Sequence, residues 1–292
     1  MTDITLGRSP VVPPTIPRTA FRPAALALVA AMALSACQRD GTPAAPAAPE
    51  APGDAATAPV DAAPAAELKD VIETNDRYVI GISYPPAANR YPGLAKLLGD
   101  YASEARTDLL EAAAAFGNDK PTAPYELSLN FEQVLDTPQI VAVAADGSSY
   151  TGGAHGAPLI ARFVWLPQQD KALTAADLVP AASGWQAISD YVREQLHAAV
   201  AIRADEDELP PADRAALIKN SARMIDEGTR PTAENFSQFV PVLDAGGRIA
   251  ALRFVFPPYQ VGPYSDGTQT VDVPAAVLLP HVAPEYAGLF AR

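Results

Sequence analysis

The chain has 292 residues, of which 49% are hydrophobic and one is a cysteine, and its formal net charge is −13. This negative charge argues against a nucleic-acid partner, because nucleic-acid binding requires a basic surface. A single cysteine excludes an intrachain disulfide bond and a cluster of thiolate ligands.

The first 36 residues have the pattern of a lipoprotein signal peptide. Two arginines precede an apolar run over residues 24–36, which is too short to span a bilayer as a mature helix. The run ends in LSAC, residues 34–37, which resembles the lipobox of bacterial lipoproteins. We therefore expect cleavage before Cys37 and a lipid anchor on its thiol, with an uncleaved signal anchor as the alternative. Gln38, rather than an aspartate, follows the cysteine, which favours the periplasmic side of the outer membrane over the inner membrane.

Residues 37–67 are predicted to be a linker. They are rich in alanine and proline and contain no aromatic residue, so they cannot bury enough apolar surface to fold. Cleavage before Cys37 would remove three arginines and one aspartate, which changes the net charge from −13 to −15. The mature chain is therefore expected to be an acidic domain held off a membrane by a tether.

The folded part is expected to begin at residue 68 and to have two halves, residues 68–170 and residues 171–292. Alternation of apolar and polar residues predicts strands in the first half, over residues 76–85, 125–131, 140–145 and 159–165. A helix is predicted over residues 92–118, with an apolar face made by Leu94, Leu97, Tyr101, Ala105, Leu109, Ala112 and Phe116.

The second half is predicted to contain two helices followed by a β-hairpin. Ser183 and Gln186 have the spacing of a capping box, and apolar residues recur at helical spacing from Trp185 to Ala199. A second helix is predicted over residues 212–227, and a hairpin over residues 239–256. Strands and helices are partly segregated, so the sequence predicts an α+β fold with antiparallel sheets packed with helices and mostly hairpin connections.

The sequence contains no recognised catalytic motif. The three histidines lack the spacing of a helical zinc site, and no nucleophile elbow or glycine-rich phosphate loop is present. We therefore predict no catalytic residue, no metal and no cofactor. An enzyme acting on cell-wall polymers is retained as a less favoured possibility, because carboxylates distant in sequence can still meet in space.

The segment YTGGAHG, residues 150–156, is the first candidate for a binding site. Gly152 and Gly153 permit a tight turn, and His155 can bond backbone groups through both ring nitrogens. The possibilities are a purely structural turn, a binding surface or, least favoured, a catalytic histidine.

The second candidate is the stretch from residue 257 to residue 267, which separates two apolar strand-like runs. A hairpin needs only two to five residues to turn, whereas this stretch holds prolines, glycines and two tyrosines. Such residues suit a rigid binding loop, because tyrosines offer a large contact area at low entropic cost. The alternative is a loop whose tyrosines pack into the core. The residues that we predict to contact a partner are Pro258, Tyr259, Gln260, Val261, Gly262, Pro263 and Tyr264.

Three stretches together resemble a known family: YTGGAHG, TAENFSQFVPVLDAGGRI and FVFPPYQVGPYSDGTQTVDVP. They are similar to the extracytoplasmic domain of the anti-sigma factor RsiV and its relatives of unknown function. The resemblance covers about residue 73 to the C-terminus and implies an α+β fold. It also implies lysozyme binding, because the best understood member binds lysozyme. Related domains also occur beside polysaccharide deacetylase modules, but no deacetylase motif is found in this sequence.

The sequence therefore predicts a lipid-anchored periplasmic binding domain. The expected partner is lysozyme or another cationic envelope protein, bound through the proline- and tyrosine-rich loop. The alternative is a module that binds peptidoglycan or another glycan without a protein partner.

Overall fold

The computed structural model describes residues 67–292 except positions 118 and 120. The predicted signal peptide, Cys37 and the predicted linker up to residue 66 lie outside these residues. Within the described part of the chain, no helix is long and apolar enough to cross a membrane.

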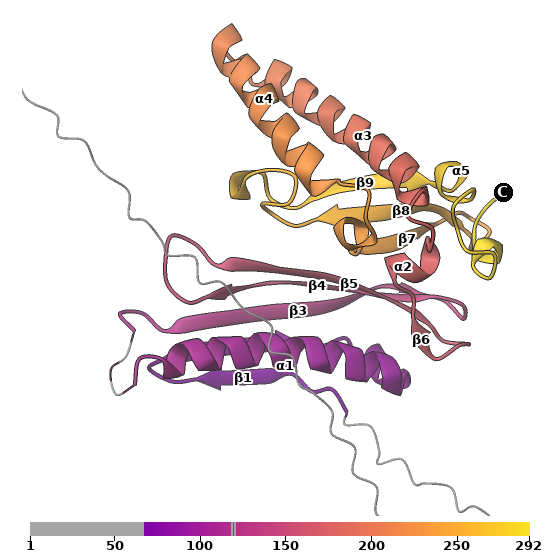
Figure 1. The fold of residues 1–292 in the computed structure, drawn as a ribbon. Coiled ribbons are helices and arrows are strands. Elements are labelled where there is room, and N and C mark those ends of the chain that lie inside the picture. Colours follow the sequence, from indigo (N-terminus) through magenta and orange to yellow (C-terminus); the bar gives the residue numbers. More distant parts are fainter. Residues whose placement is uncertain (1–66, 118, 120) are drawn as a thin grey trace, which may run out of the picture. The chain divides into compact units, whose positions relative to one another are not determined.

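Residues 71–172 contain the strands of a sheet, sheet A, in which the strands lie in sequence order (Figure 1). Its members are β1 (Val71–Thr74), β2 (Tyr78–Ser83), β3 (Tyr125–Asp136), β4 (Val141–Tyr150), β5 (Ala157–Leu166) and β6 (Lys171–Ala172). All neighbouring strands are antiparallel except β2 and β3, which are parallel and are connected by helix α1 (Pro92–Ala114). The short 3₁₀ helix η1 (Pro86–Arg90) precedes α1.

Helix α1 covers one face of sheet A. Strand β3 alternates buried and exposed residues, and the buried ones, such as Leu127 and Leu129, join the helix in one core cluster. The helix buries Leu94, Ala95, Leu98, Ala102, Ala105, Leu109 and Ala113. The predicted face is therefore rotated by about one position. The alanines of the buried stripe let the helix lie close to the sheet, whereas Leu97 and Tyr101 lie at its margin and Phe116 is exposed.

The second half of the described chain contains helices α2 (Ala175–Leu178), α3 (Gly184–Glu206), α4 (Pro211–Gly228) and α5 (Ala275–Leu278). Its strands form sheet B, with the order β7 (Phe239–Leu243), β8 (Ile249–Phe256) and β9 (Gln269–Pro274), all antiparallel. The 3₁₀ helices η2 (Ala233–Phe236), η3 (Tyr264–Asp266) and η4 (Ala287–Leu289) complete the elements. The described chain thus has the predicted α+β architecture, with mostly hairpin connections.

A second core cluster joins sheet B, helix α3 and the part of sheet A that lies next to them. Phe236 is fully buried and stacks on Trp185 at a ring-centroid distance of 5.4 Å, and Phe254 meets its edge at 5.3 Å. Ala142 and Val164 of sheet A belong to the same cluster.

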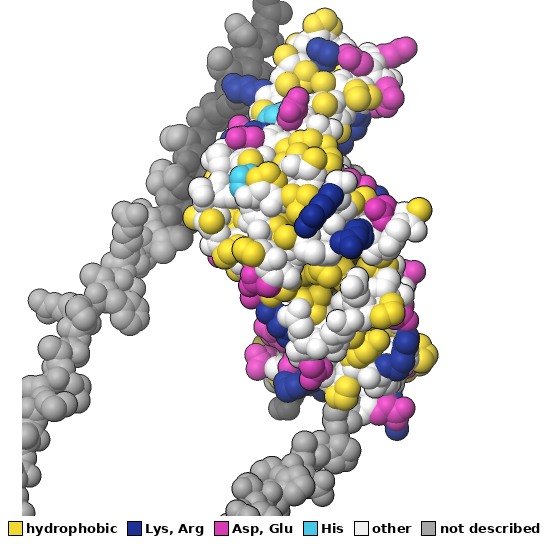
Figure 2. Space-filling model, turned by 90° about the vertical axis from the view of Figure 1, so that its right-hand side faces the viewer, with side chains coloured by type: hydrophobic (Ala, Val, Ile, Leu, Met, Phe, Trp, Pro, Cys, Tyr) yellow, Lys and Arg dark blue, Asp and Glu magenta, His cyan; other side chains and the backbone are white. Residues whose placement is uncertain are grey.

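On the surface shown in Figure 2, acidic and basic side chains are interspersed with apolar ones.

Helix capping differs from the prediction at one place. Ser183 has helical dihedral angles (φ −66°, ψ −23°) and its side chain forms no capping hydrogen bond. The capping box of this region lies instead at Thr174, whose side chain accepts a hydrogen bond from the backbone NH of Asp177 while the Asp177 carboxylate accepts from the Thr174 backbone. Ser183 cannot cap because it already lies within a helical turn, whereas capping requires extended backbone.

Candidate functional site

The two loops singled out by the sequence meet in space. Residues 151–156 connect β4 to β5, and residues 257–268 connect β8 to β9. The hydroxyl oxygen of Tyr259 lies 2.8 Å from Nε2 of His155. The imidazole ring of His155 stacks on the ring of Tyr264, with centroids 3.9 Å apart and an interplanar angle of 13°. We call the three side chains of His155, Tyr259 and Tyr264 the aromatic patch.

The aromatic patch lies at the protein surface. The exposed fraction is 53% for Tyr259 and 37% for Tyr264, and His155 is also exposed. Single exposed apolar side chains are common in soluble proteins, but three adjacent rings with defined mutual contacts are a local concentration of apolar area. The two tyrosines therefore do not pack into the core, which was the alternative interpretation of this loop.

The β8–β9 loop is fixed at its base by buried and hydrogen-bonded side chains. Val261 is only 4% exposed. The side-chain amide of Gln260 donates to the carbonyl oxygens of Gly228 and Asn235, at 3.0 and 2.8 Å. A tight turn brings the backbone NH of Tyr259 to 2.9 Å from the carbonyl oxygen of Gly262. Since the base is held in this way, the tyrosines project from a rigid support.

The backbone of Tyr259 is unusual, because its φ angle is +75°. Residues with a side chain adopt this left-handed conformation at a cost of about 1–3 kcal/mol, and they keep it only where surrounding contacts impose it. Here the turn hydrogen bond and the Gln260 contacts impose it. Tyr259 thus combines a strained backbone with a side-chain ring that is exposed to solvent.

The backbone of the β8–β9 loop packs closely against the backbone at the C-terminal end of α4. A Cβ atom built at Gly228 would lie 2.0 Å from the carbonyl oxygen of Gln260. No side chain can occupy this space unless one of the two backbones moves. Gly228 therefore allows the β8–β9 loop to lie directly against the end of the helix.

The β4–β5 turn is shaped by its glycines and by internal hydrogen bonds. Gly152 and Gly153 have φ angles of +99° and +102°, which only glycine adopts readily. The hydroxyl group of Tyr150 donates to the carbonyl oxygen of Gly153 at 3.2 Å. Nδ1 of His155 lies 3.1 Å from the carbonyl oxygen of Gly156, which can only accept, so this hydrogen bond requires a proton on Nδ1.

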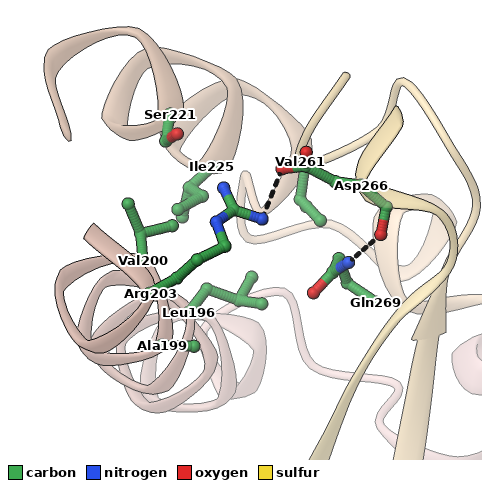
Figure 3. Close-up of a pocket in the computed structure, with 9 residues that line it drawn as sticks. All are labelled: Leu196, Ala199, Val200, Arg203, Ser221, Ile225, Val261, Asp266 and Gln269. Carbon is green, nitrogen blue, oxygen red and sulfur yellow. Dashed lines mark hydrogen bonds and ion pairs between the residues drawn. The ribbon is translucent and has the colours of Figure 1, made fainter. Parts of the chain in front are cut away.

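Beneath the loop lies a small cavity of about 140 Å³ between α3, α4 and the loop. Figure 3 shows Arg203 of α3 extending across it to the carboxylate of Asp266, at 2.9 Å. Gln269 donates from its side chain to the backbone carbonyl of Asp266 at 2.6 Å. These contacts tie the far side of the loop to the helices, so the loop is held at both ends.

The structure separates the predicted partner-binding residues into two groups. Gly152, Gly153, His155, Tyr259, Pro263 and Tyr264 are exposed, whereas Pro258 and Gln260 are partly buried and Val261 and Gly262 are buried. The second group supports the loop from within. The supporting contacts of Gly228, Arg203 and Asp266 were not predicted from the sequence, because each depends on residues distant in the chain.

Among the described residues, no group of three histidine, cysteine, aspartate or glutamate side chains could hold a metal ion. The charged groups near the loop are matched as an ion pair, Arg203 with Asp266. The arrangement at the surface offers contact area and hydrogen-bonding groups.

Comparison with known proteins finds two family models that match separate parts of the chain. Residues 72–157 match the model described as "Deacetylase PdaC", and residues 176–276 match the model described as "Protein of unknown function (DUF3298)". His155 lies in the first matched segment, and Tyr259 and Tyr264 lie in the second. No curated protein matches the chain.

Solved structures of DUF3298 proteins are also similar to this chain. A DUF3298 family member from Bacteroides fragilis NCTC 9343 has 17% identity and a TM-score of 0.47, over 76% of this chain and 94% of that one. A DUF3298 family protein from Pseudomonas aeruginosa PAO1 has 15% identity and a TM-score of 0.49, over 77% of this chain and 94% of that one. From the match of the family model, the chain carries a DUF3298-type domain, a domain of unknown function.

Proposed function

We propose that this chain is a binding protein that holds a cationic protein of the lysozyme type on its aromatic patch. The observation that carries the proposal is the meeting of two glycine-containing loops, distant in the sequence, in one exposed cluster of three rings. Tyrosine is enriched among the residues that dominate protein interfaces, where its ring supplies area and its hydroxyl group supplies a hydrogen bond.

The fixed geometry of the patch supports this proposal. Partners that are rigid before binding lose less conformational entropy when they associate, and more of the contact energy remains as affinity. The loop is held by Val261, by the Gln260 hydrogen bonds and by the ion pair between Arg203 and Asp266. These contacts order the tyrosines in the free protein.

The charge of the chain supports a cationic partner. The formal net charge is −13, and it would be −15 after removal of residues 1–36. Opposite net charges steer two proteins together and raise the rate of association, an effect that salt weakens. Lysozyme is the first partner to test, because the sequence resembles the lysozyme-binding family described above.

We further propose that Cys37 is acylated and that the protein acts at the periplasmic side of a membrane, more specifically the outer membrane. The support is the sequence pattern of residues 24–37 together with Gln38. A lipid anchor followed by an alanine- and proline-rich tether would hold the binding domain where it meets proteins that attack the cell wall.

The decisive experiment is a calorimetric titration of the full chain with lysozyme at low and at physiological salt. We expect binding in the micromolar range or tighter, with an affinity that falls as salt is added. A second titration uses soluble peptidoglycan fragments. After the titration the fragments are recovered, and their masses are determined by mass spectrometry. No lysozyme binding at high micromolar concentration and low salt would refute the proposal. Binding of unchanged fragments alone would support a glycan-binding module, and a change in fragment mass would indicate an enzyme.

A further inference from the structure

One face of sheet A is exposed on strands β2 and β3, although its continuation on β4 and β5, which includes Ala142 and Val164, is covered by sheet B. Helix α1 covers the side of β3 on which Leu127 and Leu129 lie, and the alternate residues of the strand are exposed. The same holds for the neighbouring strand β2, in which Ile80 and Ile82 are buried and the residues between them are exposed. We call this surface the open face and define it by Val79, Gly81, Glu126, Ser128, Asn130 and Glu132.

Two acidic side chains and no basic one belong to the residues that define the open face. Its central positions carry small or short polar side chains, and a Cβ atom at Gly81 would meet nothing within 4 Å. Glu126 and Glu132 are exposed and form no ion pair among the described residues. Strands β1 to β4 contain no lysine or arginine.

Arg162 lies on this face of sheet A, and its charge is already neutralised. Arg162 of β5 pairs with Asp146 of β4 at 2.8 Å, and its side chain is only 10% exposed. Its other guanidinium hydrogen bonds go to the backbone carbonyls of Ala145 and Ala161. The charge that the open face offers to solvent is therefore carried by its two unpaired glutamates.

The open face is continuous with the aromatic patch. Glu126 of β3 lies directly opposite Tyr150 of β4 in the antiparallel register, and side chains at such positions lie on the same face of a sheet. Tyr150 donates to Gly153 in the β4–β5 turn, and that turn carries His155. In Figure 1 the β4–β5 turn and the β8–β9 loop lie at the same end of the molecule.

The aromatic patch is too small to be a whole protein interface. A stable complex buries roughly 800 Å² on each partner, which corresponds to about 20–30 residues, whereas the patch has three. A protein bound at the patch must therefore cover neighbouring surface. The open face is the adjoining surface with unpaired charge of the sign that a cationic partner needs.

We propose that the open face is the second half of the partner-binding surface and that Glu126 and Glu132 pair with basic groups of the cationic partner. This inference rests on the proposed function, since it concerns the same partner. It assigns the two parts different tasks. The open face sets the rate of association and its dependence on salt, and the aromatic patch sets the rate of dissociation.

The test compares two double variants of the full chain that change the net charge equally. E126K/E132K reverses the charge of the open face, and E104K/E111K reverses two exposed glutamates on α1, which covers the opposite face of the sheet. Association with lysozyme is followed by stopped flow over a range of salt concentrations. We expect E126K/E132K to lower the association rate constant about tenfold more than E104K/E111K does at low salt, and this difference to shrink as salt is added.

The outcomes separate this inference from the proposed function. All four glutamates are exposed, so both variants should retain the circular dichroism spectrum and melting temperature of the unchanged protein. If the unchanged protein binds lysozyme and both double variants slow association equally, the open face has no special role, although the proposed function stands. If the unchanged protein does not bind lysozyme, both proposals fall.

Discussion

The hydroxyl group of Tyr259 and the imidazole of His155 are joined by a hydrogen bond of 2.8 Å, although 104 positions separate the two residues in the sequence. The bond links the segment that matches the "Deacetylase PdaC" model to the segment that matches the DUF3298 model. The patch is thus a tertiary feature that neither segment forms alone.

Removing this hydroxyl group should loosen the β4–β5 turn. We expect Tyr259→Phe to increase amide hydrogen exchange in residues 151–156, while the free energy of unfolding falls by less than about 1 kcal/mol, because the bond is exposed. Tyr264→Phe is the matched control, since no hydrogen bond of the Tyr264 hydroxyl group is found among the described residues. Equal exchange in both variants would show that the bond does not hold the turn.

Both loops of the candidate site can be identified from the sequence, but the contact between them cannot. Glycine, proline and tyrosine in a long connection indicate a rigid surface loop by local chemistry alone. The contact between His155 and Tyr259 depends on how sheet B packs beside β5, for example through the hydrogen bond from the Arg162 backbone to Gln238. The periodicity of apolar residues in one sequence does not indicate which residues distant in the chain come into contact.

The elements themselves were largely predictable, and the differences have local causes. The predicted apolar face of α1 includes Leu97, Tyr101 and Phe116, whereas the buried stripe has the small residues Ala95, Ala102 and Ala113 in addition to the leucines. A helix that lies close to a sheet needs such residues at the contact. The capping box at Thr174 and Asp177 could have been found from its spacing, which is the same signal that suggested Ser183.

Gly228 should be needed for the position of the β8–β9 loop. In Gly228→Ala the new methyl group meets the carbonyl oxygen of Gln260, so we expect the free energy of unfolding to fall by about 1–3 kcal/mol, despite the better helix propensity of alanine. Gly288→Ala is the control, since a Cβ atom there meets nothing within 4 Å. Denaturant unfolding measures both. A Gly228→Ala variant as stable as Gly288→Ala would mean that the backbone shifts without cost.

The ion pair between Arg253 and Asp272 should contribute to stability only above acidic pH. The hydrogen bond and positive charge of Arg253 hold the pKa of the Asp272 carboxyl group below its usual value. The carboxylate therefore stabilises the fold above the pKa that aspartate has in the unfolded chain. This stabilisation is lost as the pH falls through the lower pKa of the folded state.

Asp272→Asn should lower the free energy of unfolding by about 0.5–1 kcal/mol at pH 7, because the pair spans two strands but remains partly exposed. The difference from the unchanged protein should vanish at strongly acidic pH. Asp108→Asn, on the exposed side of α1, should show no such difference at any pH. Urea unfolding across the acidic range measures this dependence. A constant difference between Asp272→Asn and the unchanged protein would exclude the ion pair as its cause.

Cys37→Ser should abolish membrane anchoring. The thiol is the expected acyl acceptor, and a serine hydroxyl group cannot replace it in the lipobox reaction. We expect the variant to leave the membrane fraction or to accumulate uncleaved, with altered migration in a denaturing gel. The same distribution and migration as the unchanged protein would exclude lipidation at Cys37. The folded domain serves as an internal control, because its melting temperature should not change.

The binding energy should be concentrated in the aromatic patch. Tyr264 stacks on His155 and keeps 37% of its surface exposed, so Tyr264→Ala removes contact area from a partner without opening the core. We expect it to weaken lysozyme binding by about 2 kcal/mol, roughly 30-fold in Kd, mainly through faster dissociation. Phe116→Ala is the matched control, since Phe116 is also 37% exposed but packs edge-to-face on Tyr125, which belongs to the core under α1. Surface plasmon resonance on variants with native circular dichroism spectra gives both rate constants. Equal affinities for the two variants would mean that Tyr264 is part of the scaffold, whereas a loss confined to Tyr264→Ala would place the partner on the patch.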